Sequence, residues 1–191
     1  MRLLSHLAML CCCIGFTSAG GYAGGARRCC PPRNNCPPSA PQLANTIWVV
    51  PQSTLLAYFH AGGSDTATSD QTVWVIDSAN KGYFFGTAYP SLNGTPSTSL
   101  RMVGSLTPLG DVYITYYPTS GSFAETQVVD GIGRLVRSGG QFVFIMQMNS
   151  SQNPISGLSH WSYMVSVTPS SPLYKNLPGV NMSVPDYIAQ F

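Results

Sequence analysis

The chain beyond residue 42 consists of short apolar runs that are separated by turn residues. These runs are rich in Val, Ile, Thr and aromatic residues, which is typical of β-strands, and none keeps the 3.6-residue period of a long helix. The sequence therefore predicts a domain that is almost entirely β-structure. Strands are predicted at residues 46–50, 54–60, 72–76, 83–89, 100–106, 111–117, 126–136, 141–148 and 160–167, and a short helix within residues 184–190.

Turn residues between the predicted strands recur at nearly equal intervals. Gly82, Gly110 and Gly139 each lie in such a turn, and residues 61–65 are predicted to form a loop. Even spacing is typical of an antiparallel meander, and the repeat is shorter than the roughly 40 residues of a propeller blade. The predicted fold class is therefore all-β, an antiparallel meander of about eight to ten strands that forms a β-barrel or a β-sandwich.

The predicted strand at residues 141–148 is apolar on both faces. In it Phe144 and Met146 alternate with Val143 and Ile145, and side chains two positions apart share one face. A sheet with one wet face carries polar residues on that face instead. The outer row must therefore be covered, by a second layer of the same domain, by a partner protein or by lipid. Val143 and Ile145 are candidates for that contact.

Residues 1–19 have the pattern of a secretory signal peptide, with a basic start, an apolar run over residues 3–16 and small residues up to Ala19. The pattern predicts export, so we expect the protein in the periplasm, at the outer membrane or outside the cell. A cysteine near the end of such a run is also where a bacterial lipoprotein is modified, which would attach the protein peripherally to a membrane. The candidates for lipidation are Cys11, Cys12 and Cys13.

Residues 20–41 form a segment rich in Gly, Pro and Cys, which we call the N-terminal arm. Its paired prolines favour an extended, polyproline-like conformation. Its odd number of cysteines suggests one internal bridge and one thiol left for a partner. No cysteine follows it, so the predicted β domain at residues 42–169 and the tail at residues 170–191 contain no disulfide. The disulfide candidates are Cys29, Cys30 and Cys36.

Charge is scarce throughout the chain. Only 8% of the residues are charged and the net charge is +2, against about 25% charged residues in an ordinary globular domain. Arg27, Arg28 and Arg33 all lie in the arm, which leaves too few basic residues for a face that binds a nucleic-acid backbone. We therefore expect no nucleic-acid partner.

Residues with catalytic or ligating chemistry are sparse. His60 stands near Gly62, Gly63 and Asp65, which makes a secreted hydrolase one alternative, but no Gly-x-Ser-x-Gly motif occurs. Most acidic residues fall in or beside predicted turns, where Asp caps the backbone. No phosphate-binding loop, dinucleotide fingerprint or EF-hand spacing occurs, and a zinc site lacks ligands at suitable spacing. We therefore assign no catalytic residue, no cofactor and no metal.

The segment Asn45-Thr46-Ile47-Trp48 resembles the start of lipocalin and avidin-like barrels. In those families a Gly, one further residue and a Trp open the first strand, and the Trp plugs the floor of the barrel. Thr46 stands here in place of that Gly. The resemblance implies a small-ligand pocket inside a barrel. Its implied lining residues are Trp74, Phe85, Tyr113 or Phe144.

These patterns favour a non-catalytic exported β domain that acts as an assembly or interaction subunit of a cell-envelope complex, such as an outer-membrane or secretion-system assembly. Its expected partners are other envelope proteins or further copies of the same chain. Low charge and an apolar outer face support that expectation, because a freely soluble domain usually keeps a charged exterior. The alternatives are a lipocalin- or avidin-like ligand-binding barrel and a secreted hydrolase. The candidate ligand or partner contacts are Trp48, Trp74, Tyr113, Val143, Ile145, His160 and Trp161.

Overall fold

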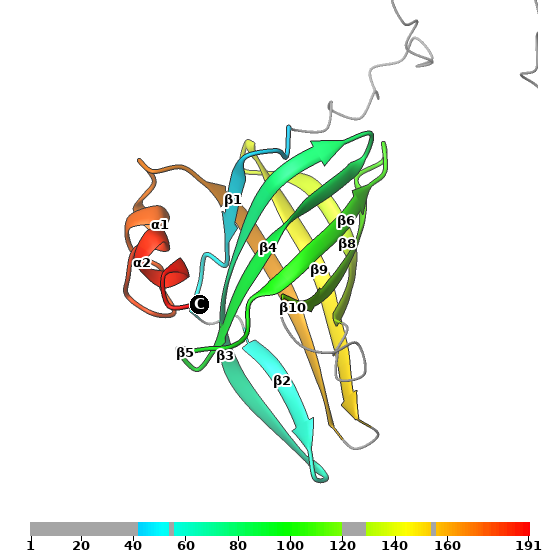
Figure 1. Cartoon of the computed structure of the whole chain (residues 1–191), viewed down its shortest axis with the longest axis vertical. Helices are drawn as coiled ribbons and strands as arrows, with labels where there is room; N and C mark the ends of the chain where they lie inside the picture. The colour runs from blue at the N-terminus through cyan, green and yellow to red at the C-terminus, as the bar shows by residue number, and fades with distance from the viewer. Residues whose placement is uncertain (1–41, 54–55, 120–128, 154–155) are drawn as a thin grey trace, which may run out of the picture. The chain divides into compact units, whose positions relative to one another are not determined.

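A computed structural model of the chain describes residues 42–53, 56–119, 129–153 and 156–191. These residues form a closed antiparallel β-barrel of eight strand positions, shown in Figure 1. The barrel confirms the predicted all-β meander and decides between barrel and sandwich. The predictions for residues 1–41, which concern the signal peptide, lipidation and disulfides, lie outside the described residues.

The strands follow one another around the barrel in sequence order, and β1 pairs with β10 to close it. Neighbouring strands pair antiparallel, as in an up-and-down meander. The strands are β1 (Thr46–Val49), β2 (Leu56–Ala61), β3 (Ser64–Asn80), β4 (Tyr83–Leu92), β5 (Thr95–Pro96), β6 (Leu100–Leu106), β7 (Asp111–Pro118), β8 (Val129–Ser138), β9 (Gln141–Asn153) and β10 (Ser156–Val167).

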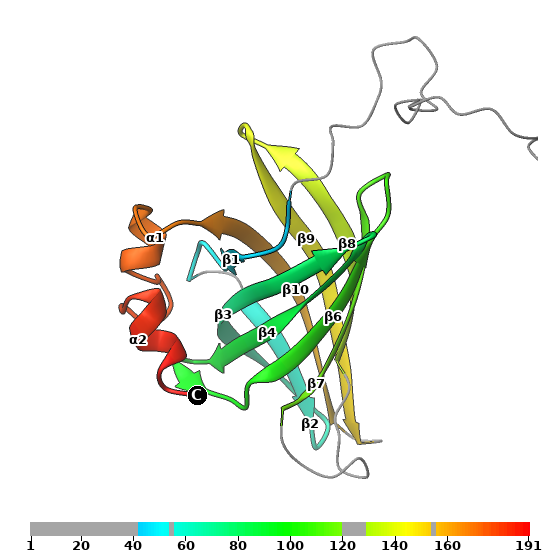
Figure 2. The ribbon, with the colours of Figure 1, turned by 45° about the horizontal axis from the view of Figure 1, so that its top comes forward.

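The first position of the barrel is shared by two strands. β1 pairs with the last part of β3 and of β10, while β2 pairs with the first part of both. Between them, the Val50 amide still donates to the Thr72 carbonyl at 3.2 Å. Pro51 follows, and proline has no N–H with which to continue a ladder. Pro51 therefore accounts for the interruption between β1 and β2, which is visible in Figure 2.

The two ends of the barrel differ. The turns at Lys81-Gly82, Thr107–Gly110 and Gly139-Gly140 lie at the end where the described chain begins, and we call it the closed end. The β2–β3 hairpin lies at the opposite end, the open end, together with the β9–β10 connection. Gly62 and Gly63 form the two-residue turn of that hairpin with φ of 60° and 82°, and positive φ at both positions is what such a turn requires.

A packed apolar core fills the barrel toward the closed end. Trp48 and Trp74 both contact Phe144, with ring centroids 4.5 and 5.4 Å apart. Trp48 also donates from Nε1 to the Thr46 hydroxyl at 2.8 Å. Gly104 faces the ring of Phe84 so closely that a Cβ would collide with it. Trp48 thus lies buried in the barrel interior, as the resemblance implied for the Trp of that motif.

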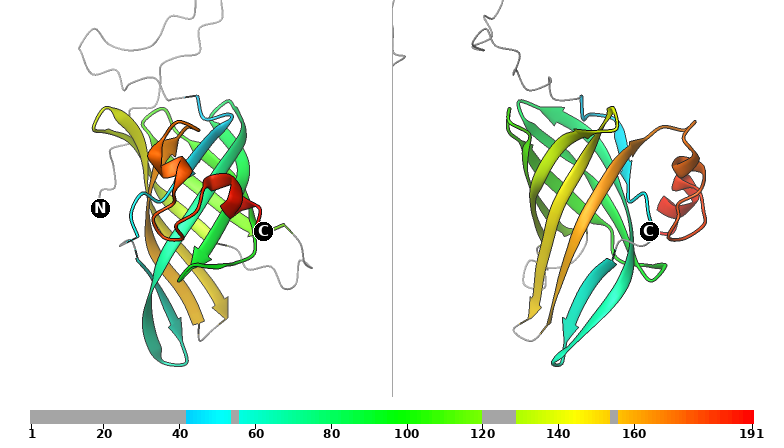
Figure 3. Two further views of the ribbon diagram at one scale, coloured as in Figure 1. Left: turned by 90° about the vertical axis from the view of Figure 1, so that its left-hand side faces the viewer. Right: turned by 180° about the vertical axis from the view of Figure 1, so that it is seen from behind.

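The chain after β10 covers part of the outer face of the barrel. It contains α1 (Pro172–Lys175) and α2 (Val184–Ile188), which lie beside β1 in Figures 1 and 3. We call residues 172–191 the C-terminal cover. The Tyr187 hydroxyl donates to the Gln71 carbonyl at 2.7 Å, and the Gly179 amide donates to the Gln71 side chain at 2.9 Å. An apolar layer lies beneath these bonds.

Several strands are longer than predicted. β3 has 17 residues, whereas only residues 72–76 were predicted, and the predicted loop at residues 61–65 is a tight turn within the β2–β3 hairpin. The added part of β3 is polar and rich in Ser and Thr, so hydrophobic periodicity gives no signal there, although Thr favours strands. Among the residues that the structure describes, no helix is long and apolar enough to span a membrane.

Candidate functional site

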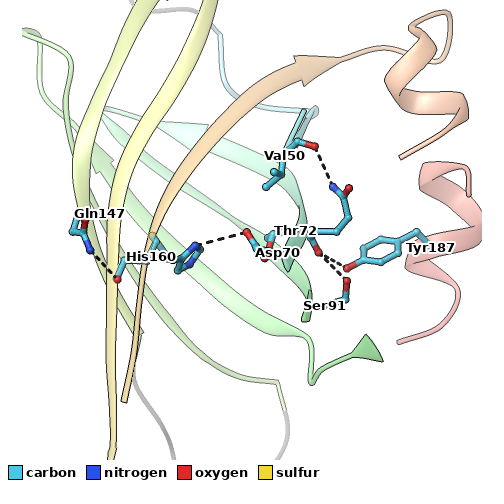
Figure 4. A network of polar contacts seen from close by, with 9 residues as sticks. Val50, Asp70, Thr72, Ser91, Gln147, His160 and Tyr187 are labelled. Atoms are coloured by element: carbon cyan, nitrogen blue, oxygen red, sulfur yellow. Dashed lines mark hydrogen bonds and ion pairs between the residues drawn. The ribbon is translucent and has the colours of Figure 1, made fainter. Parts of the chain in front are cut away.

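Three polar side chains from three different strands face the inside of the barrel. Asp70 of β3 shares a face with Trp74, Tyr116 of β7 shares one with Ile114, and His160 of β10 shares one with Met164. Asp70 is 3% exposed and Tyr116 is 2% exposed. We call Asp70, Tyr116 and His160 the lumen site. Figure 4 shows the His160 and Asp70 side chains pointing toward each other.

The lumen site contains buried polar atoms that are not hydrogen-bonded. One carboxylate oxygen of Asp70 accepts from the Thr72 hydroxyl at 2.8 Å. Its other oxygen lies 3.7 Å from Nδ1 of His160, which is too long for a hydrogen bond. Within the described part of the chain, that Asp70 oxygen, His160 Nδ1 and the Tyr116 hydroxyl are buried without a hydrogen-bond partner, although the first two lie at ion-pair distance from each other. An unsatisfied buried polar atom costs about 1–3 kcal/mol, so this arrangement is suited to receive the polar group of a ligand.

Burial also sets the protonation of the lumen site. It raises the pKa of the Asp70 carboxyl, while the nearby His160 and the Thr72 hydroxyl lower it by a smaller amount. Burial raises the pKa of the Tyr116 phenol well above its usual value, and the Asp70 charge raises it further. Tyr116 therefore stays a neutral phenol at physiological pH and keeps a hydrogen to donate.

Apolar side chains border the lumen site. Met102 lies directly across from Tyr116 on β6, and Met148 lies across from His160 on β9. The ring centroids of Trp74 and Tyr116 are 6.0 Å apart. Methionine side chains are flexible and adapt their shape to what packs against them. These surroundings favour a ligand whose body is apolar and whose polar part is small.

The lumen site lies between the packed core and the open end. On the inward face beyond it, Phe59 of β2 pairs with Thr66 of β3 and with Leu158 of β10. These two apolar side chains are only partly buried, unlike the core. Phe59 and Leu158 therefore lie next to Asp70 and His160 on the side of the β2–β3 hairpin. Within the described residues, no third His, Cys, Asp or Glu joins them in a group that could hold a metal ion.

The candidate contacts predicted from sequence fall into separate places. Trp48 and Trp74 lie in the core and His160 lies in the lumen site. Val143 is fully buried under the C-terminal cover, so its outer face is already occupied by the same chain. Phe85, implied as a lining residue of the lumen, faces outward because Phe84 takes the inward position. The same alternation turns Tyr113 outward.

Tyr113, Ile145 and Trp161 come together on the outer face of β7–β10. They line a groove of about 490 Å³ with Ile132 and Gln147, which we call the outer groove. Tyr113 is 60% exposed and Trp161 is 62% exposed. The Arg134 side chain pairs with Asp111 at 3.3 Å along one rim. The outer groove is therefore a second surface with unusual chemistry, on the opposite side of the sheet from the lumen site.

Sequence reasoning missed two members of the lumen site. Asp70 was not singled out among the acidic residues, and Tyr116 was not singled out within the predicted strand at residues 111–117. Asp70 could have been found from the two-residue period of the strand. Asp70, Thr72 and Trp74 are two positions apart and therefore share the inward face. No signal within one strand shows that β3, β7 and β10 face one another across a lumen. That information exists only in the closed topology.

His60 and Asp65 do pair with each other, across the β2–β3 hairpin. Both side chains are exposed, at 54% and 71%. The Ser64 hydroxyl beside them donates to the Ala61 carbonyl at 3.1 Å and not to His60. Ser64 therefore does not make the contact from nucleophile to base on which hydrolytic serine chemistry depends.

Comparison of the chain with protein-family models, with curated proteins and with solved structures found no significant match. The structure defines the protein class as a closed up-and-down β-barrel, with a polar site inside the barrel next to a packed apolar core.

Proposed function

We propose that this protein binds a small, mostly apolar organic molecule inside its barrel. The observation that carries the proposal is the set of three buried polar atoms on Asp70, Tyr116 and His160 that have no hydrogen-bond partner among the described residues. Folded proteins satisfy nearly all buried polar groups, and exceptions cluster where a function requires them. Ligand sites are typically apolar concavities with a few polar groups that converge on one point. The lumen site has that composition.

The polar groups also define the head of the ligand. The free Asp70 oxygen can only accept a hydrogen bond when the carboxyl is ionised, and the Tyr116 hydroxyl can donate or accept. Every Lys and Arg in the described part of the chain is exposed, so none faces the lumen. An anionic head would therefore meet the Asp70 carboxyl with no Lys or Arg to pair with it. We infer a neutral head that donates at least one hydrogen bond, such as a hydroxyl, an amide or an aromatic amine.

The test is a fluorescence titration with N-phenyl-1-naphthylamine, an apolar probe with one N–H donor. The full-length protein is expected to bind it and to enhance its emission. Asp70→Asn is expected to weaken binding about tenfold, because a hydrogen bond to a charged group contributes about 1.5–3 kcal/mol. Asp77→Asn is the matched control, because Asp77 lies on the outside and pairs loosely with Arg101 at 3.9 Å.

Unchanged binding by a folded Asp70→Asn variant would overturn the proposal. Tyr116→Phe serves as a second variant because it keeps the ring that packs against Trp74. If Asp70→Asn does not fold, Tyr116→Phe decides the matter, and equal affinity for the probe then counts against the lumen site.

A second function, assembly into a cell-envelope complex, is favoured by a different observation. Tyr83, Tyr113, Ile132 and Trp161 lie in one continuous row of cross-strand neighbours on the outside of the barrel. All four are more than half exposed. Rows of exposed apolar residues on soluble domains commonly mark interaction surfaces. We propose that this row contacts other subunits if the protein is part of an assembly.

Native sizing in extracts of the source cells tests this second function. The wild-type protein is expected in a large complex, and Ile132→Glu is expected to release it as a folded monomer. A wild-type protein that migrates as a monomer contradicts the assembly role. That result leaves the lumen proposal untouched, because Ile132 faces away from the lumen.

A further inference from the structure

The separation between Asp70 and His160 fits one particular polar group. We propose that the head of the lumen ligand is a hydroxyl group whose oxygen atom bonds both the free Asp70 oxygen and His160 Nδ1. The ligand class is then an apolar alcohol or phenol. This inference rests on the proposed binding of a small molecule in the lumen, and it narrows the head of that molecule from neutral donors in general to a hydroxyl.

The free Asp70 oxygen and His160 Nδ1 lie at a distance that one atom can bridge. They are 3.7 Å apart, and Figure 4 shows the two side chains pointing toward each other. This distance is too long for a direct hydrogen bond between them. A hydrogen bond joins heavy atoms about 2.8 Å apart, so two such bonds through a common atom span up to about 5.6 Å. A single ligand oxygen beside the pair therefore reaches both atoms at once.

The donor and acceptor roles of the pair favour a hydroxyl over other polar heads. When His160 Nδ1 carries the hydrogen, it donates and the Asp70 oxygen accepts. When the Asp70 oxygen carries the hydrogen and Nδ1 has a free lone pair, the two roles are reversed. Either arrangement needs a ligand atom that both donates and accepts. A hydroxyl does both, whereas an ether or a ketone only accepts and a diarylamine N–H only donates.

Tyr116 matches the remaining bonding capacity of the same ligand oxygen. A hydroxyl donates one hydrogen bond and accepts two, so it can accept from a second donor. The Tyr116 phenol keeps its hydrogen because burial raises its pKa, and the Asp70 charge raises that pKa further. Its hydroxyl has no hydrogen-bond partner among the described residues. One ligand hydroxyl thus has the capacity to satisfy all three polar atoms of the lumen site.

The direct neighbours of Asp70 and His160 favour a single polar head on an apolar body. Leu92 lies across from Asp70 on β4. Ala57 and Met148 lie across from His160 on β2 and β9. A second polar group of the ligand beside these apolar side chains would be buried without a hydrogen bond, which is unfavourable.

Equilibrium dialysis against three compounds with one ring system tests the inference. 1-Naphthol carries a hydroxyl, 1-methoxynaphthalene carries an oxygen that only accepts, and naphthalene carries no polar group. The full-length protein is expected to bind 1-naphthol about tenfold more tightly than either of the others, because its hydroxyl bonds a carboxyl and an imidazole. His160→Phe is expected to reduce this preference, since only part of the bonding set remains. His60→Phe is the matched control and is expected to keep the preference, because His60 is exposed on the β2–β3 hairpin.

Equal affinities of the wild-type protein for all three compounds would overturn the hydroxyl inference and leave the proposed binding of apolar molecules standing. A preference for 1-naphthol that is unchanged in His160→Phe would also overturn it, because the hydroxyl would then lie elsewhere. If His160→Phe does not fold, Asp70→Asn takes its place, and an unchanged preference has the same meaning. A protein that binds none of the three compounds would contradict the proposed function itself and this inference with it.

Discussion

Asp70 is a buried carboxyl with an incomplete set of hydrogen-bond partners among the described residues. Its free carboxylate oxygen has no hydrogen-bond partner among the described residues, and His160 stands 3.7 Å away. A buried carboxylate that is incompletely paired weakens the folded state. Proteins commonly retain such groups where binding needs them, at a cost in stability. The raised pKa of Asp70 and the hydroxyl of Tyr116 can each be tested with a single substitution.

The first prediction concerns pH. Because burial raises the pKa of Asp70 above its ordinary value of 3.8, the folded state holds this proton more tightly than the unfolded state. The contribution of Asp70 to stability is then largest below that ordinary pKa and is lost as pH rises through the raised pKa. Urea unfolding is expected to show the wild-type protein losing stability relative to Asp70→Asn from about pH 4 upward. Parallel stability curves for the two proteins would contradict the assigned burial of this carboxyl.

The second prediction separates stability from binding at Tyr116. Its hydroxyl is buried without a partner, so Tyr116→Phe is expected to leave the free energy of unfolding unchanged or to raise it by about 1 kcal/mol. The same change is expected to weaken binding of N-phenyl-1-naphthylamine. Denaturant unfolding and the fluorescence titration measure the two effects on one sample. A variant that loses stability but binds normally shows that the hydroxyl has a structural partner instead.

The outer face of β9 is apolar along its length, but different surroundings meet it at different positions. Both rows of the strand are apolar, and the prediction that the outer row is covered is confirmed at Val143 but not at Ile145, which is only partly buried. The cover at Val143 is the C-terminal cover of the same chain, whereas at Ile145 the strand borders the outer groove. Periodicity shows that a face is buried but not by what, because the burying element comes from a distant part of the sequence.

This difference predicts that a change to Glu destabilises the protein much more at Val143 than at Ile145. Val143→Glu is expected to destabilise the protein by on the order of 3 kcal/mol, because the carboxylate would lie in an apolar layer without a partner. Ile145→Glu is expected to have a much smaller effect, because that side chain is only partly buried. Thermal unfolding with circular dichroism compares them directly. A Val143→Glu variant as stable as the wild type would show that the C-terminal cover does not pack there.

Other elements were predicted well where the apolar pattern was strong. The strands that begin at Tyr83, Leu100, Asp111 and Gln141 start where the sequence predicted them. The polar beginning of β3 and the helix α1 were missed, since Ser- and Thr-rich strands and one-turn helices carry little periodic signal. The lumen site was missed for a third reason, because closure of the barrel alone brings Asp70, Tyr116 and His160 together.

For the whole molecule, cohesion of the barrel must come from burial. No cysteine follows Cys36, so reductant is expected to leave the melting temperature of the barrel unchanged. Limited proteolysis is expected to trim the chain to about residue 42 and to leave a folded core, because the paired prolines of the arm disfavour compact structure. Mass spectrometry of the resistant fragment, with circular dichroism before and after trimming, measures both. A core that unfolds when the arm is removed would show that the arm is an integral part of the barrel.

The central claim for the whole molecule is that the barrel is a ligand container whose polar site is Asp70, Tyr116 and His160. The most direct measurement is a crystal structure of the full-length protein with N-phenyl-1-naphthylamine. The probe is expected inside the barrel, with its N–H within hydrogen-bond distance of the Asp70 carboxylate and its rings between Trp74 and Met148. A probe that lies only in the outer groove, beside Trp161, would contradict it.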